Sequence, residues 1–123
     1  MILRQLERSA AAGATKGSLN GTNSVTIVAA PAAGFMRRVE CVRFVNVDTA
    51  AVDIRLRLTI AGPTHYECDN VIALAVDGKF FPVEGADVIW LDTTDSLTAV
   101  MGGAAATTNP TWVSGWVDVP VPV

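Results

Sequence analysis

Short runs of alternating apolar and polar residues follow one another along most of the chain, separated by turn-forming residues. The clearest run is Val52–Ile60, in which every second side chain is aliphatic and those between are Asp, Arg or Thr. Because successive side chains of a strand point to opposite faces of its sheet, this run predicts a strand with one buried face. We expect Ala61, Gly62 and Pro63 to end it.

Further segments carry the same signature and predict strands throughout the chain. A change of phase, from Val39 and Cys41 to Val42 and Phe44, predicts a β-bulge or a shift between sheets. The apolar run Asn70–Val76 could form one helical turn. Besides Val52–Ile60, the predicted strands are Ser24–Ala30, Met36–Val47, His65–Cys68, Lys79–Val83, Val88–Leu91, Leu97–Met101 and Thr111–Val119.

About eight short strands with no long helix between them are typical of an antiparallel β-sandwich or jelly roll. The length of 123 residues suits one such domain. The first residues differ, because a short amphipathic turn is followed by a stretch of Ala, Gly, Ser and Thr without any period. We therefore predict a single all-β domain over residues 24–123, preceded by an extended N-terminal arm over residues 1–23.

Composition narrows the possible partners. Hydrophobic residues make up 50% of the chain and charged residues 17%, which indicates a dense core or apolar surface covered within an assembly. The formal net charge of −3 argues against nucleic acid and against an anionic membrane surface as partners. No apolar run approaches the ~20 residues that span a bilayer, and the N-terminus lacks the core of a signal peptide. We expect synthesis in the cytoplasm.

The order of these segments carries a family resemblance over about three quarters of the chain. The pattern consists of a first strand ending in Pro, an Arg-rich entry to a strand that ends in an Asn-x-Asp turn, an alternating strand, a Phe-Pro strand, a Trp-Leu-Asp step and a Ser-Leu-Thr-Ala-Val strand. It resembles small β-sandwich proteins of tailed-bacteriophage virions. The matching segments are Val25–Pro31, Arg37–Asp48, Val52–Ile60, Phe80–Val83, Trp90–Asp92 and Ser96–Val100.

This resemblance implies a non-enzymatic virion protein, made in the host cytoplasm, that decorates or cements the phage head. Its partners would be the major capsid protein or other virion subunits, and a homotrimer is the favoured oligomer. A neck or tail component and a glycan-binding module of an adsorption apparatus are the alternatives. In the favoured hypothesis the arm, with the apolar side chains of Ile2, Leu3 and Leu6, lies along a neighbouring subunit.

Two further sets of residues are candidate partner-binding groups. Arg55 and Arg57 point to one face of their strand. If that strand pairs antiparallel with Met36–Val47, the arginines of the two strands can form cross-strand ion pairs with Glu40 or Asp53, or they can face an acidic neighbour. Trp112 and Trp116 share the parity of Ser114 and Asp118, so they could stack on sugars or anchor the core or an interface. Exposure of both would favour sugar binding, and burial of both would exclude it. Trp90 is expected in the core.

No catalytic, cofactor-binding or metal-binding set is predicted. His65 is the single histidine, and a strand-end position packed beside Tyr66 is the favoured interpretation. Asp92 and Asp95 could contribute to a calcium loop, although Asp is also an ordinary turn former. The two cysteines, Cys41 and Cys68, lie in strand-like runs and are expected as buried free thiols, with a cross-strand disulfide or a reactive thiol as alternatives.

Overall fold

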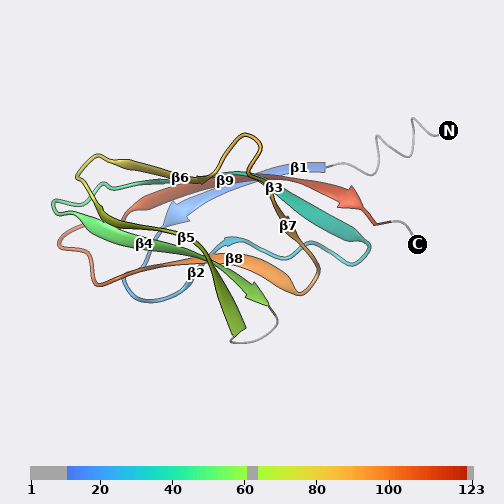
Figure 1. Cartoon of the computed structure of the whole chain (residues 1–123), viewed down its shortest axis with the longest axis horizontal. Helices are drawn as coiled ribbons and strands as arrows, with labels where there is room; N and C mark the ends of the chain where they lie inside the picture. Colours follow the sequence, from blue (N-terminus) through green and yellow to red (C-terminus); the bar gives the residue numbers. More distant parts are fainter. Residues whose placement is uncertain (1–10, 61–63, 122–123) are drawn as a thin grey trace.

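The computed structural model describes residues 11–60 and 64–121, which form nine strands and, within these ranges, no helix. Figure 1 shows two antiparallel sheets packed face to face, so the predicted all-β sandwich is confirmed. The strands are β1 (Ala11–Ser18), β2 (Val25–Val28), β3 (Phe35–Val45), β4 (Val52–Ile60), β5 (Thr64–Leu74), β6 (Lys79–Val83), β7 (Ile89–Leu91), β8 (Asp95–Met101) and β9 (Thr111–Pro120).

The strand order is that of a jelly roll. One sheet has five strands in the order β1-β9-β3-β6, with β7 also pairing with β3, and the other has four in the order β2-β8-β4-β5. Two interleaved Greek keys produce this arrangement. At one side of the sandwich β1 lies against β2, and at the other β5 lies against β6. Each side of the molecule therefore presents one outer strand from each sheet.

The core lies between the sheets and follows the predicted alternation. On β4 the buried side chains are Val52, Ile54 and Leu56, as period 2 requires. The phase change in β3 is a β-bulge, since its register with β9 shifts between Val39 and Cys41. The other buried apolar side chains of this core are Leu19, Ile27, Val28, Val39, Val42, Phe44, Val83, Leu91, Leu97, Ala99, Met101 and Trp112.

Residues 11–18 form a strand of the five-stranded sheet, whereas they were predicted to belong to an extended arm outside the β domain. The prediction failed because β1 pairs with β9 in a register that sets Gly13 opposite Trp116 and Gly17 opposite Trp112. A Cβ atom on Gly13 would lie 2.5 Å from the Trp116 ring, and one on Gly17 would lie 2.9 Å from the Trp112 ring. The glycines that resemble a linker are needed because two indole rings approach the backbone closely.

The Trp116 ring is also fixed from β3. The guanidinium of Arg37 lies 4.6 Å from the centroid of this ring. Two charge-assisted bonds, of 2.7 and 3.0 Å, join Arg37 to the carboxylate of Asp118, and a third bond of 2.9 Å reaches the carbonyl oxygen of Ala29. One side chain of β3 thus connects β9 with the segment that follows β2.

Two polar side chains hold the loops at the opposite end of β3. Asn46 is fully buried, and its amide nitrogen donates to the carbonyl oxygens of Ala50 and Leu74 at 2.9 Å and of Ala75 at 3.2 Å. Its side-chain oxygen accepts the backbone N–H of Asp48 at 2.9 Å. The expected local turn is present, and the same amide also fixes the end of β5.

Asp48 is 3% exposed and accepts hydrogen bonds from a second loop. Its carboxylate accepts the backbone N–H groups of Thr49, Ala106, Thr107 and Thr108 at 2.8 to 3.1 Å. These donors, that of Thr107 foremost, stabilise the ionised form and hold the pKa of Asp48 well below its usual range, although burial acts in the opposite direction. The loop between β8 and β9 is therefore organised around one buried charge.

The contact of Gly13 with the indole ring leads to a stability prediction. Gly13→Ala lowers the free energy of unfolding by roughly 1–3 kcal/mol, because the added methyl group must displace a ring that Arg37 also contacts. Gly103→Ala is the matched control, since a Cβ there meets nothing within 4 Å. It changes stability by less than about 0.5 kcal/mol. Denaturant unfolding measures both, and equal effects would contradict the packing of β1 on β9.

Asp48 generates a prediction about pH. Because its pKa is lower in the folded than in the unfolded chain, its ionised form stabilises the fold fully above about pH 4, and this stabilisation is lost as the pH falls further. Asp48→Asn therefore destabilises the protein strongly at pH 7, and the difference from the parent chain shrinks below about pH 4. Urea unfolding over a pH series measures it, with Asp87→Asn at an exposed turn as control. A difference that does not vary with pH refutes the role of the charge.

Candidate interaction surfaces

Arg55 and Arg57 lie on the outer face of the four-stranded sheet, where β5 supplies an acidic partner. The carboxylate of Glu67 is 3.9 Å from Nη1 of Arg55 and 3.4 Å from Nε of Arg57. The prediction that these ion pairs join Met36–Val47 to Val52–Ile60 is wrong, because β3 and β4 lie in different sheets. The acidic partner is Glu67 of β5 instead. The Arg57 side chain is only 20% exposed, while that of Arg55 is 52% exposed. Binding of an outside partner by this pair stays a prediction.

Trp112 and Trp116 face inward and do not form an exposed aromatic platform. Trp112 is 6% exposed and belongs to the core, and Trp116 packs against that core. The indole nitrogen of Trp112 is enclosed and has no hydrogen-bond partner in the described part of the chain. Sugar stacking needs accessible ring faces, so this pair does not support the glycan-binding alternative.

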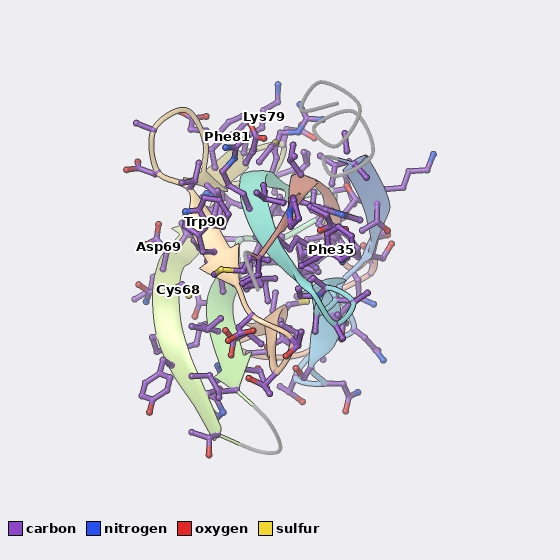
Figure 2. All side chains as sticks on the ribbon, turned by 90° about the vertical axis from the view of Figure 1, so that its right-hand side faces the viewer. Phe35, Cys68, Asp69, Lys79, Phe81 and Trp90 are labelled. Atoms are coloured by element: carbon purple, nitrogen blue, oxygen red, sulfur yellow. The ribbon has the colours of Figure 1, made fainter. Side chains whose placement is uncertain are left out.

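Trp90 is exposed, although its position in the run Val88–Leu91 predicted a place in the core. In β7 the side chain of Leu91 is the one that turns inward, so the neighbouring Trp90 points outward and is 43% exposed. The guanidinium of Arg38 lies 5.7 Å from its ring centroid, and Arg38 also pairs with Glu40 at 3.0 Å. Phe81 of β6 is likewise 43% exposed (Figure 2). Two aromatic side chains thus border β3 on the outside.

Both cysteines are exposed free thiols, which corrects the expectation that they are buried. Cys41 follows the bulge in β3 and stands opposite Gly115 on the outer face. Cys68 is the extra residue at a bulge in β5, where the register with β4 shifts. Desolvation of its sulfur raises the pKa of Cys68, and the carboxylates of Glu67 and Asp69 raise it further. The thiolate is therefore scarce at neutral pH.

The remaining candidates for chemistry are His65 and the carboxylates of Asp92 and Asp95. His65 is exposed in β5. In the turn before β8, the Asp95 carboxylate accepts the N–H of Asp92 at 3.0 Å, and the Asp92 carboxylate accepts that of Thr93 at 2.6 Å. Both carboxylates therefore cap their own turn. Within residues 11–60 and 64–121, no three His, Cys, Asp or Glu side chains gather as metal ligands.

Two further predictions concern membrane crossing and the N-terminal arm. In the ranges that the structure describes, no helix has the length and apolar character needed to cross a bilayer. Ile2, Leu3 and Leu6, which were predicted to contact a neighbouring subunit, lie outside the described residues.

The sequence patterns did not predict the exposed edges that the outer strands β1 and β5 present. β5 was predicted as a short strand followed by a separate apolar run, but it continues over 11 residues through its bulge. Nearly all of its side chains are exposed, including Tyr66 at 58% and Ile72 at 74%. Among the described strands β5 pairs with β4 alone, and β1 pairs with β9 alone. The exposed hydrophobic residues of β5 were the available signal, but the bulge obscures their alternation.

Comparisons with known proteins inform the fold more than the function. No family model and no curated protein matches this chain. A solved structure described as "Bacillus endospore appendages form a novel family of disulfide-linked pili" is similar, with a TM-score of 0.53 and 11% sequence identity over 92% of this chain and 88% of that chain. At this identity the likeness shows the fold alone. That description is of pili, so the fold serves a structural role there.

Proposed function

We propose that this protein is a non-enzymatic structural subunit that assembles with further copies of itself into an extended structure. The observation that carries this proposal is the pair of long outer strands, β1 and β5, which lie at opposite sides of the sandwich (Figure 2). An outer strand presents unpaired backbone donors and acceptors to any strand that approaches it. Contacts between two different surfaces of one molecule repeat without closing unless the rotation between copies closes a ring.

The exposed apolar surface of β5 is unfavourable for a protein that functions as a monomer. Tyr66 and Ile72 are large apolar side chains that remain more than half exposed on a strand with a free edge. Exposed apolar side chains on an unpaired edge are a liability for aggregation in monomeric proteins. In an assembled protein the same features become contact surface, which removes the liability.

The similarity to an appendage protein supports the same proposal. The matched structure is described as a family of disulfide-linked pili, and pili are built from repeated subunits. The description also names disulfide linkage for that family. This chain carries two exposed thiols, Cys41 and Cys68, which could reinforce contacts between copies once strand pairing has brought them together.

A phage head decoration protein is the second form of this function. Its support is the pattern of strands and turns shared with small virion β-sandwich proteins, together with an outer aromatic surface that includes Phe81 and Trp90. In that case the aromatic surface docks on the major capsid protein or another virion subunit, and copies close into a trimer rather than growing. Both forms are structural roles. They differ in whether the partner is a copy of this chain or another virion subunit, and in whether the copies close into a trimer or continue to grow.

Solution mass separates these possibilities. We expect the average mass from light scattering to rise continuously with protein concentration under reducing conditions, and electron microscopy to show filaments or sheets. Reducing conditions exclude disulfides as the cause of growth. A discrete trimer that does not grow supports the decoration form instead. A monomer at every concentration from micromolar to millimolar contradicts self-assembly.

A further inference from the structure

We infer that β1 of one copy pairs with β5 of the next, so that the five-stranded sheet of each molecule continues into the four-stranded sheet of its neighbour. This inference rests on the proposed function, because it names the contact by which copies assemble. Strand addition at a sheet edge is a recurring mode of protein recognition. The partner surface is therefore a second copy of this chain.

The lengths of the outer strands favour β1 and β5 as the pair that joins two copies. β1 has eight residues and β5 has 11, whereas β2 has four, β6 has five and β7 has three. Backbone hydrogen bonds supply the affinity in strand addition, and their number grows with the length of the paired segment. Pairing of β1 with β5 uses the two long edges that the described part of the chain offers.

Charge favours pairing between unlike edges. The charged side chain of β1 is Lys16, whereas β5 carries the carboxylates of Glu67 and Asp69. Because Glu67 already pairs with Arg55 and Arg57, the repulsion in a pairing of β5 with a second β5 comes chiefly from the two Asp69 carboxylates. Like charges across a strand pair are destabilising. Pairing of β1 with β5 places the lysine among these carboxylates instead.

Shape also suits the unlike pair. β1 pairs with β9 in an unbroken register, so its free edge is regular. Its side chains are mostly Ala, Gly, Ser and Thr, which leave room for the exposed Tyr66 and Ile72 of an approaching β5. Small residues beside a strand already accept large side chains in this protein, since Gly13 and Gly17 lie under indole rings. The same complementarity would repeat between copies.

Placement then determines the form of the assembly. β1 lies on one side of the sandwich against β2, and β5 lies on the other against β6 (Figure 2). A molecule that has used β5 to bind one neighbour therefore still offers β1 to another. The two strands also belong to different sheets, so each added copy is displaced by one sheet layer relative to the last.

A cross-linking experiment tests the pairing with the native Cys68 as reporter. In a Cys41→Ser background, single cysteines are introduced on β1 as Ala12→Cys or Ala14→Cys, and on β2 as Thr26→Cys for the matched control. All three positions are exposed, and β2 lies on the same side of the sandwich in the other sheet. The proteins are oxidised with a low-molecular-weight disulfide, which takes two electrons and two protons from each thiol pair and is itself reduced to two thiols.

The reaction is run at about pH 9, because the raised pKa of Cys68 makes its thiolate scarce near neutrality. We expect ladders of disulfide-linked oligomers on non-reducing gels for at least one β1 cysteine, formed at least ten times faster than for the β2 control. Adding Cys68→Ser to the same variant should abolish ladders beyond the dimer, because each chain then has a single thiol.

The outcomes separate this inference from the proposed function. Growth by light scattering without faster cross-linking from β1 than from β2 overturns the pairing of β1 with β5 and leaves self-assembly standing. Cross-linking from Thr26→Cys that is as fast as that from the β1 cysteines, or faster, likewise overturns the pairing of β1 with β5. A monomer in light scattering that forms no ladders overturns both. Light scattering of each variant before oxidation shows which case applies.

Discussion

The pairing of β1 with β9 beneath two indole rings is the constraint on which the architecture depends. Gly13 and Gly17 allow the rings of Trp116 and Trp112 to lie over their backbone, at separations that no side chain larger than hydrogen would permit. This contact joins the first described strand to the last one. It completes the five-stranded sheet, covers one end of the core and makes β1 an outer strand. The edge proposed for assembly exists because of this packing.

Polar side chains that are buried or partly buried fix the remaining geometry in a chain with few charges. Arg37 connects Trp116, Asp118 and the carbonyl of Ala29, which ties the two sheets together near one end. Asn46 and Asp48 organise the loops at the other end of β3. Each of these groups is matched by several partners, which is the condition under which buried polar groups stabilise a unique arrangement. Through the carbonyl oxygen of Leu74, Asn46 also holds the end of the outer strand β5.

Much of the fold could be predicted from the sequence, because one-sided strands record their burial as alternation. Val52–Ile60 and Lys79–Val83 were predicted with the bounds that the structure has. The phase change predicted after Cys41 indicated a bulge, which the structure has between Val39 and Cys41. β1 was missed because its small residues carry no alternation, and their purpose appears only when residues about 100 positions away are placed opposite them. The bulge at Cys68 concealed the continuity of β5.

The candidate surfaces were harder to predict, since parity alone does not say which face of a strand meets solvent. The tryptophans of β9 proved internal, and Trp90, Cys41 and Cys68 proved external. We propose that the outer strands β1 and β5 act as complementary edges on opposite sides of the sandwich. Hydrogen–deuterium exchange of dilute and assembled protein tests it most directly. We predict that assembly slows exchange in residues 11–18 and 64–74 together. Assembly that leaves the exchange of both strands unchanged would contradict the account.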